Sequence, residues 1–475
     1  MIQDEGISTI TSTPLQFFTM MPLSPKLGSP YLWLRELKSE ERGLYLIHLL
    51  LTCANHVAVG SLDSANLALD QISHLASADG DTMQRIAAYF AEALADRVLK
   101  TWPGLYKAFN STKIPMVSEE ILVKKLFFEM FPFLKVAFVL TNQAIVEAME
   151  GEKMIHIIDL NGNETAQWLA LMQVLSARPE GPPHLRITGV HPQKEILDQM
   201  APRLTEVAEK LDIPFQFNSV ISQLEDLDIE KLRVKTGEAL AINSVLQLHT
   251  LLGSDEVLQK TSSSAAKSAN VVQYSRYSLS ELLDKDLVNR CSPSPDSVSS
   301  SALSQSNATK INRFLDGLWS LTPKVMVVTE QDCNHNGSTL MERLLEALHT
   351  YAAIFDCLES NMSRTSVERL KLEKMLFGEE IKNIIACEGV ERKERHEKHE
   401  KWCQRFDITG FRHVSLSYYG MLQAQSLLQG YGCDGYRMKE ENGCVMICWQ
   451  DRPLFTVSAW RCCNRMNIEE TAFSL

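Results

Sequence analysis

The fold is decided by the stretch Met154-Ile155-His156-Ile157-Ile158-Asp159-Leu160, which is bracketed by Gly151 and Gly162. This apolar run is long enough for a buried strand and too short for a helix. Segments whose apolar residues have helical spacing lie between most runs of this kind. Strands that alternate with helices predict right-handed βαβ units around a mostly parallel sheet. The similar runs lie at residues 185–190, 213–217, 239–246 and 324–329.

Two further apolar runs, residues 444–449 and 454–460, lie close together near the end of the sequence. The separation between them is typical of a hairpin. We therefore predict an α/β fold whose mostly parallel sheet ends in an antiparallel pair. The residues between the runs are Gln450, Asp451, Arg452 and Pro453.

The region before the first strand has a different pattern. Residues 1–30 are rich in Ser, Thr and Pro and predict a flexible arm. Residues 31–115 read mainly as helices, and the helix between 83 and 98 has its apolar residues on one side. We interpret this region as a helical cap on an α/β core that spans residues 116–460. The alternative is an apolar stripe that binds a helix of a partner.

Residues 261–310 interrupt the α/β pattern and contain 15 serines. Such a segment buries too little apolar surface to offset the entropy that is lost on ordering. We predict a disordered insertion within the core.

The charge balance bears on function. The 475-residue chain has 47 Lys and Arg against 59 Asp and Glu, a formal charge of −12. Proteins that hold DNA by neutralising phosphates usually carry a basic excess, so the sequence disfavours strong unaided DNA binding. No apolar run reaches the ~18 residues of a membrane span. The acidic start does not resemble a secretory or transit peptide, and we expect a soluble intracellular protein.

The 11 cysteines are odd in number, and no pair has C-x-x-C spacing. Cys444 and Cys448 lie four residues apart in an apolar run. We expect reduced, mostly buried thiols rather than a zinc site or a disulfide framework.

The end of the first strand is one candidate ligand site, because ligands of doubly wound sheets bind beyond the carboxyl ends of the strands. Asp159 is followed by the single Gly162, whereas nucleotide-binding loops use several glycines to let the backbone approach a phosphate. The next strand ends at Val190 and His191, with no acid for a ribose hydroxyl. The pattern disfavours a cofactor and leaves a degenerate nucleotide or S-adenosylmethionine site as the alternative.

A second polar cluster follows the last of the predicted parallel strands. Its Glu330, Asn334 and His335 could perform acid–base chemistry. They could equally fix the loop and cap the helix that starts near Thr339, and we favour this structural role. His156 lies inside an apolar strand and is interpreted as a satisfied core histidine. The sequence has no Ser–His–Asp, H-E-x-x-H or Walker-type spacing, so we predict no catalytic residues, no cofactor and no metal.

The segment 391–401 is densely charged. Its acidic and basic residues are spaced i,i+4 in the order that stabilises a helix. We predict a solvated, salt-bridged helix, with a polar recognition surface as the alternative. The pairs are Glu391/Arg395, Glu394/Lys398 and Glu397/Lys401.

Leu248, Leu251 and Leu252 form an L-x-x-L-L motif, and the stretch from Leu46 to Leu50 forms another. Such leucines anchor a helix in the apolar groove of a partner. Partner binding through Leu248, Leu251 and Leu252 is one hypothesis, and burial in this protein's own core is the favoured one.

These segments together resemble the GRAS proteins, plant transcriptional regulators named for their DELLA and scarecrow members. The stretch from Ile155 to Asp159 is similar to the VHIID signature of that family, with Ile in place of the leading Val. Leucine-rich regions flank it, and the match covers roughly residues 30–460, most like the scarecrow-like branch. The later motifs, in the order of the family, carry Glu330, Asn334, His335, Arg392, Trp449, Arg452 and Trp460.

The resemblance implies a Rossmann-like fold similar to that of S-adenosylmethionine-dependent methyltransferases, with an N-terminal helical cap. It also implies a nuclear, non-enzymatic regulator of transcription that promotes gibberellin response and root development. The implied partners are DELLA proteins, C2H2 zinc-finger proteins of the indeterminate-domain type, and other GRAS proteins, with the zinc finger reading the DNA. The alternative is a small-molecule-binding or methyltransferase-like protein that uses Asp159, Glu330 and His335.

Overall fold

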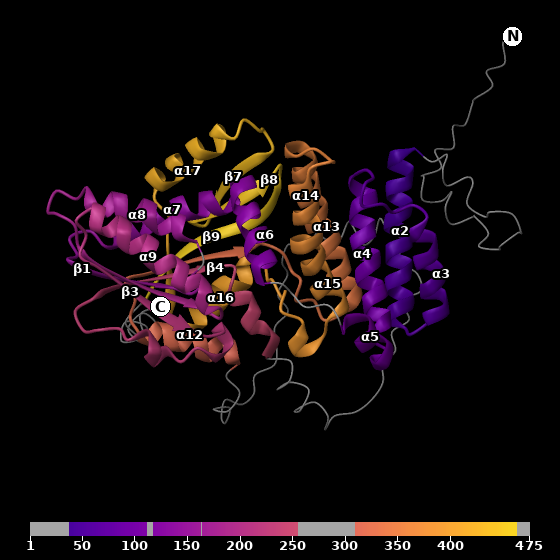
Figure 1. Cartoon of the computed structure of the whole chain (residues 1–475), viewed down its shortest axis with the longest axis horizontal. Coiled ribbons are helices and arrows are strands. Elements are labelled where there is room, and N and C mark those ends of the chain that lie inside the picture. Colours follow the sequence, from indigo (N-terminus) through magenta and orange to yellow (C-terminus); the bar gives the residue numbers. More distant parts are fainter. Residues whose placement is uncertain (1–37, 112–116, 163, 255–308, 463–475) are drawn as a thin grey trace, which may run out of the picture.

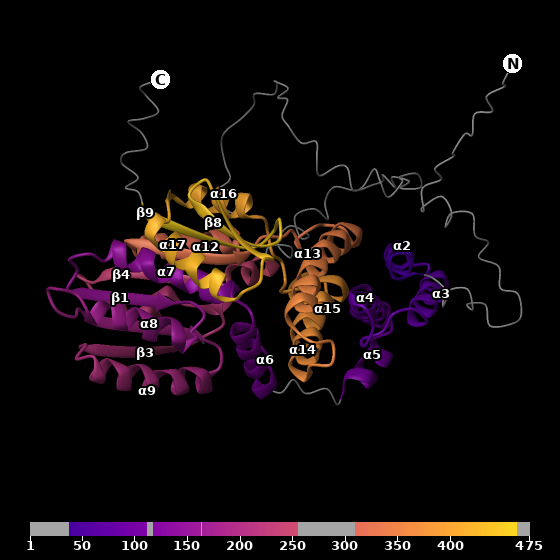
Figure 2. The ribbon, with the colours of Figure 1, turned by 90° about the horizontal axis from the view of Figure 1, so that it is seen from above.

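Figures 1 and 2 show the computed structural model, which describes residues 38–111, 117–162, 164–254 and 309–462. The expected flexible arm, residues 1–30, lies outside the described residues. The expected disordered insertion, residues 261–310, also lies outside them, apart from its last two residues. In Figure 1 a sheet with flanking helices occupies the left of the view, and a group of helices occupies the right.

Five parallel strands carry the apolar runs identified in the sequence. The strand β1 lies between β2 and β4, and its side chains after Met154 are buried on both faces of the sheet. Ile155 and Ile157 enter one apolar core, and Ile158 enters the other. The strands are β1 (Met154–Asp159), β2 (His184–His191), β3 (Phe215–Ile221), β4 (Ala239–Val245) and β5 (Val325–Gln331).

The third strand differs most from its expected position, since the sequence predicted residues 213–217 and β3 ends at Ile221. The backbone N–H of Ile213 donates to the carbonyl of Ala208 and so belongs to the end of the preceding helix. As an edge strand, β3 exposes polar residues such as Gln216, and no continuous apolar run marks its extent.

Antiparallel strands complete the sheet, and the predicted C-terminal hairpin is confirmed as β8 and β9. Gln450 in the turn between them has a φ of 52°. The added strands are β6 (Phe411–Val414), β7 (Tyr436–Glu441), β8 (Cys444–Trp449) and β9 (Arg452–Cys462). Within the described residues the order is β3-β2-β1-β4-β5-β9-β8-β7, with β6 paired to β9. The long strand β9 therefore lies between β5 and β8, which extends the sheet beyond a simple terminal hairpin.

Helices cover both faces of this sheet. One apolar core contains side chains of α7, α8 and α9, and α17 packs on α7. The other core contains side chains of α12 and α16. This layered arrangement is the α/β fold that the sequence predicted. The helices are α7 (Phe133–Ala148), α8 (Thr165–Ser176), α9 (Lys194–Lys210), α12 (Lys310–Ser320), α16 (His399–Thr409) and α17 (Tyr418–Gly430).

A separate helical region is built from two stretches of sequence that lie far apart along the chain (Figure 2). The first stretch holds α2 (Ser39–Ala58), α3 (Leu62–Ser73), α4 (Thr82–Leu99) and α5 (Pro103–Asn110). The second holds α13 (Leu340–Asn361), α14 (Val367–Lys371), the π-helical turn Leu372–Phe377 and α15 (Gly378–Ala386). The helix α6 (Val117–Met130) packs against that π-helical turn and α7.

The second stretch corrects the predicted division of the chain, because the sequence analysis assigned all of it to the α/β core. Both α13 and α15 pack against α4. Phe90 of α4 and Tyr351 of α13 lie with their ring centroids 6.3 Å apart, and Arg85 of α4 forms an ion pair with Glu373. The helical region is therefore larger than the cap expected at residues 31–115. The order of elements along the chain does not reveal that a later segment joins it.

Candidate functional site

Asp159 ends β1 at the sheet edge where a ligand was considered. Its carboxylate accepts hydrogen bonds from the indole N–H of Trp168 at 2.8 Å, the side-chain amide of Asn243 at 3.2 Å and the backbone N–H of Asn161 at 3.2 Å. The side chain is buried, which raises its pKa. Both carboxylate oxygens therefore accept hydrogen bonds within the protein. Asp159 thus anchors the loop after β1.

Two surface hollows of the described chain lie elsewhere. One of about 810 Å³ is lined by residues of α3 and α4 and by Trp102, and another of about 450 Å³ adjoins it. Neither is lined by Asp159, Glu330 or His335. The three residues considered for small-molecule chemistry therefore do not face either of these hollows.

His156 is confirmed as a satisfied core histidine. Its Nε2 lies 2.8 Å from Thr188 Oγ1, and its Nδ1 lies 3.0 Å from Arg186 and 3.4 Å from Glu238. Burial, together with the charge of Arg186, lowers the pKa of His156 to about 4. The ring is therefore neutral in the folded protein at neutral pH.

We expect His156 to make the protein less stable as the pH falls from about 6.5 to about 4. The unfolded chain takes up a proton near the ordinary pKa of 6.5, whereas the folded ring does so only near 4. The unfolded state binds more protons in this window, so acid favours unfolding. Urea unfolding between pH 4 and 7.5 measures the effect. His156→Gln should give a shallower slope of stability against pH, whereas the exposed control His74→Gln should keep the wild-type slope. An unchanged slope in His156→Gln would contradict this account.

Glu330 ends β5 and holds the turn that follows β4. One carboxylate oxygen accepts the backbone N–H groups of Gln247 and Leu248 at 3.0 and 2.8 Å, and the other lies 2.8 Å from His249 Nδ1. Burial opposes a charge on His249, but the carboxylates of Glu330 and Glu394 outweigh it and raise the pKa of His249 to about 10. The structure thus supports the structural role that the sequence analysis favoured for Glu330.

The hypothesis that Leu248, Leu251 and Leu252 anchor a partner is wrong for the fold described here. The three leucines lie in the 3₁₀ segment Leu248–Ser254 and are at most 3% exposed. They belong to the apolar core shared with α12, so they cannot reach a groove on another protein without local unfolding. Their burial confirms the favoured interpretation, and Leu46 and Leu50 are buried in the same way.

The prediction of a solvated helix at residues 391–401 is also wrong. A single 3₁₀ turn at Gly389–Glu391 leads into non-helical backbone, and α16 begins only at His399. We call residues 387–398 the connecting segment. Four of its ionisable side chains are buried, those of Arg392, Arg395, His396 and Glu397.

The expected charge pairs are largely replaced by contacts to other elements. Glu391 pairs with Lys100, directly after α4, at 3.2 Å, and Lys398 lies 3.6 Å from Asp332 in the loop after β5. The pair of Glu397 with Lys401 is present at 3.8 Å. An i,i+4 charge pattern indicates a helix only when the charges face water, and here most of them contact side chains and carbonyls of other elements instead.

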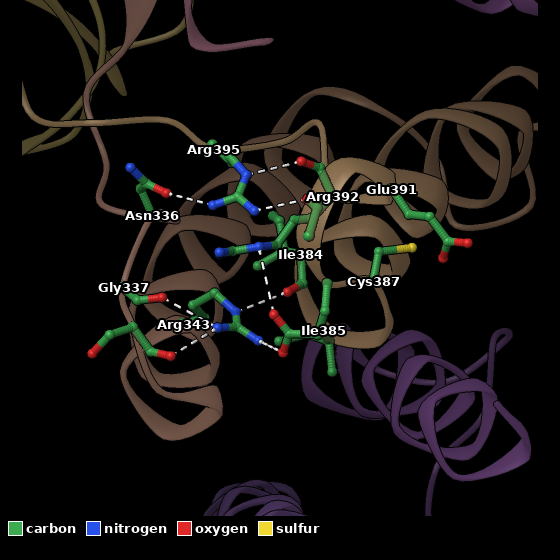
Figure 3. Close-up of polar contacts among 12 residues, drawn as sticks. Asn336, Gly337, Arg343, Ile384, Ile385, Cys387, Glu391, Arg392 and Arg395 are labelled. Carbon is green, nitrogen blue, oxygen red and sulfur yellow. Dashed lines mark hydrogen bonds and ion pairs between the residues drawn. The ribbon is translucent and has the colours of Figure 1, made fainter. Parts of the chain in front are cut away.

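Arginines of the connecting segment and of α13 bind backbone carbonyls of two loops (Figure 3). Arg395 donates to Asn336 Oδ1 at 3.0 Å and to the carbonyl of Gly389 at 2.9 Å. Arg343 donates to the carbonyls of Gly337 and Ile384 and pairs with Glu388. Arg392 donates to the carbonyl of His335 at 3.1 Å. We call this cluster the polar junction, and its members are Asn336, Arg343, Glu388, Arg392 and Arg395.

The polar junction joins the helical region to the sheet. Arg97 of α4 pairs with Glu388 at 2.8 Å, and Lys100, directly after α4, lies 3.1 Å from Cys387. On the other side, Asn336 lies in the loop that follows β5. Because buried guanidinium groups are rigid, multiply bonded donors, the cluster fixes the relative position of these parts.

Comparison with known proteins identifies the family. The model of the GRAS domain family matches residues 46–461. The chain belongs to the GRAS family. It is 63% identical over 474 residues to Scarecrow-like protein 3 of Arabidopsis thaliana, covering 97% of this chain and 98% of the relative. It is 51% identical to the GRAS family protein TF80 of Medicago truncatula, covering 91% and 99%.

A solved structure agrees with these matches. The crystal structure of SCL7 in Oryza sativa superposes with a TM-score of 0.68 at 29% identity, covering 88% of this chain and 99% of that chain. The likeness confirms the expected Rossmann-like α/β fold with its N-terminal helices and C-terminal antiparallel strands. The expected resemblance to the scarecrow-like branch of the GRAS family is confirmed as well.

The GRAS motif residues do not converge on one catalytic pocket. Asn334 and His335 lie in the loop after β5, beside Glu330 and the polar junction. Trp449 and Arg452 lie instead at the turn between β8 and β9 and face α13. The indole N–H of Trp449 donates to Asp356 at 2.7 Å, and Arg452 donates to Glu346 and Thr350, both at 3.2 Å. Trp460 is buried in the core under α16.

Sequence reasoning did not name Arg343 of α13 or His396 of the connecting segment, both of which are buried. Arg343 shares a helix face with Leu340, Ala347 and Tyr351, all of which are buried. A single arginine within an apolar stripe was the available signal. His396 and Glu397 gave no such signal, because their neighbours in sequence are all charged or polar.

Proposed function

We propose that this GRAS protein is a nuclear transcriptional co-regulator that acts through protein contacts. Its DNA-binding partners in this proposal are C2H2 zinc-finger proteins of the indeterminate-domain type, and DELLA proteins are further partners. The zinc finger reads the DNA, and the GRAS protein changes the transcription that results. The proposed outcome is promotion of gibberellin response and root development, with other GRAS proteins as additional partners.

The observation that carries the proposal is the near full-length similarity to Scarecrow-like protein 3 of Arabidopsis thaliana. The formal charge of −12 supports indirect rather than direct contact with DNA, because phosphate neutralisation needs a basic face. No helix among the described residues is both long and apolar enough to cross a bilayer.

The methyltransferase alternative has less support. A ligand at the end of β1 would have to displace Trp168 or Asn243 from the carboxylate of Asp159. Displacement would leave a buried carboxylate with fewer donors, which costs free energy. Calorimetry with S-adenosylmethionine is expected to show no saturable heat, and saturable binding that Asp159→Asn abolishes would revive this alternative.

A DNA band shift at physiological salt tests the proposed function. The purified full-length chain alone should give no sequence-specific shift, because it lacks a basic excess. With a C2H2 zinc-finger protein of the indeterminate-domain type, it should retard the band further than the zinc finger does alone. A probe with a scrambled zinc-finger site is the matched control and should show no supershift.

Two outcomes would contradict the proposal. A sequence-specific shift by the chain alone would mean that the fold carries a DNA-binding face. Absence of a supershift, together with absence of binding to a DELLA protein in a pull-down, would remove the tethered co-regulator.

A further inference from the structure

Three atoms of the kind that ligate metals meet inside the protein beside the polar junction. Cys333 Sγ lies 3.5 Å from His335 Nδ1, and His335 Nδ1 lies 3.0 Å from His396 Nδ1. All three side chains are at most 1% exposed. The two histidines are 61 positions apart in sequence, one in the loop after β5 and one in the connecting segment.

Hydrogen bonds alone satisfy this group poorly. The Nδ1 atom of a neutral imidazole offers one lone pair or one proton. His335 Nδ1 therefore cannot pair well with both the sulfur of Cys333 and the ring of His396. His335 Nε2 is also buried and makes no hydrogen bond to the described part of the chain, and His396 Nε2 has a Glu394 oxygen 3.3 Å away but outside hydrogen-bond geometry. A metal ion would accept a lone pair from all three atoms at once.

The spacing suits a tetrahedral zinc ion. Zinc–sulfur bonds of about 2.3 Å and zinc–nitrogen bonds of about 2.0–2.1 Å place neighbouring ligand atoms about 3.3–3.6 Å apart. The sulfur–nitrogen separation of 3.5 Å falls in this range. The nitrogen–nitrogen separation of 3.0 Å is about 0.3 Å below it, which a small rotation of one ring supplies.

The protonation states agree with this geometry. Burial lowers the pKa of His335 to about 3 and lowers the pKa of His396 well below its ordinary value, so both rings are neutral. Neutral imidazole is the form that binds metal. Burial raises the pKa of the Cys333 thiol, so zinc must displace the thiol proton to solvent as the sulfur–zinc bond forms.

Charged groups of both signs surround the cluster. Lys398, Arg392 and Arg452 act on His335 from the connecting segment and β9, and cationic His249 acts from the turn after β4. Asp332 and Glu346 act on Cys333. Zinc binding with loss of the thiol proton adds one net positive charge, which the carboxylates of Asp332 and Glu346 favour and the surrounding cations oppose.

We propose that this protein binds one zinc-type divalent cation through Cys333 Sγ, His335 Nδ1 and His396 Nδ1. Gln331 Oε1, which lies 3.8 Å from Cys333 Sγ, or a water molecule completes the coordination. Glu394 lies 3.3 Å from His396 Nε2 and would accept its N–H, as carboxylates do behind zinc-bound histidines. The ion has a structural role, since it ties the loop after β5 to the connecting segment.

A neighbouring group of His249, Glu394 and His396 is a poorer site. The pKa of His249 is raised to about 10, so that ring is protonated and has no lone pair to donate to a metal ion. It also offers no thiolate. The preferred set is therefore the one that contains Cys333.

Metal analysis of the full-length chain tests the proposal. The chain is expressed with added zinc, purified without a polyhistidine tag, and analysed by inductively coupled plasma mass spectrometry. About one zinc per chain is expected for the wild type. Cys333→Ser and His335→Asn should each reduce the content to a small fraction. Cys403→Ser and Cys444→Ser are matched controls, because each thiol also lies near one histidine but belongs to no close group of three metal-type ligands among the described residues, and both should keep the zinc.

Refolding of the wild type in the presence of Co²⁺ gives a second measurement that does not depend on the folding of the variants. A thiolate-to-cobalt charge-transfer band and tetrahedral ligand-field bands are expected at one equivalent. Wild-type chains that hold no zinc and show no such bands would overturn the proposal. Zinc that persists in folded Cys333→Ser and His335→Asn would overturn it too, because the metal would then lie elsewhere.

Discussion

Replacing Glu373 by Gln is expected to lower the free energy of unfolding by about 3–5 kcal/mol, because it removes the carboxylate partner of buried Arg85 and leaves buried Arg369 with Glu359 alone. Glu373 lies in the π-helical turn and binds Arg85 of α4 at 2.9 Å and Arg369 of α14 at 2.7 Å. All three side chains are at most 1% exposed. A carboxamide keeps the volume of the carboxylate but removes the charge that compensates two guanidinium groups.

Chemical unfolding of the full-length chain measures this effect, and Glu379→Gln is the matched control. Glu379 is exposed in the first turn of α15, a few residues away. The control should change stability by no more than about 0.5 kcal/mol. If Glu373→Gln cost less than about 1 kcal/mol, the two arginines would have to find other partners or water.

Replacing Trp460 by Ala is expected to cost about 3–5 kcal/mol through the cavity that it leaves. Trp460 is 1% exposed and packs in β9 against Phe406 and His413, with ring centroids 4.6 and 5.2 Å apart. Its indole N–H donates to Ser458 at 2.9 Å, so this buried donor is paired in the native core. The burial confirms the interpretation of Trp460 as a core residue.

Thermal unfolding of the variant, compared with Trp102→Ala, checks this prediction. Trp102 is 47% exposed at the start of α5, so its loss should lower the melting temperature far less. If Trp460→Ala lost partner binding while its melting temperature stayed at the wild-type value, Trp460 would act at an interface instead.

The parallel sheet could be predicted because each of its central strands is buried on both faces and reads as a continuous apolar run. The outer strands lack this signal. In β7, from Tyr436 to Glu441, most side chains are polar and exposed, and pairing with β8 rather than burial makes it a strand. The edge strand β3 was misplaced for the same reason.

The candidate site was harder to predict, because local patterns do not show which face of a charged segment meets the core. Glu391 and Arg395 have helical spacing in the sequence. In the structure the backbone around them is not α-helical. The guanidinium groups of this segment donate to backbone carbonyls of two loops instead. The roles of Glu330 and His156 were predictable, since each follows from a polar residue at a position that the sheet must bury.

The position of β9 between β5 and β8 has a consequence for how the chain is made. Five parallel strands leave the ribosome before residues 452–462, yet the sheet stays open along β5 until that segment arrives. Until then β5 presents an unpaired backbone edge of the kind that joins with other chains. Pairing over such long sequence separations slows folding and prolongs this exposure. Newly made chains will therefore depend on chaperones, and messages cut short before codon 452 will yield protein prone to aggregate.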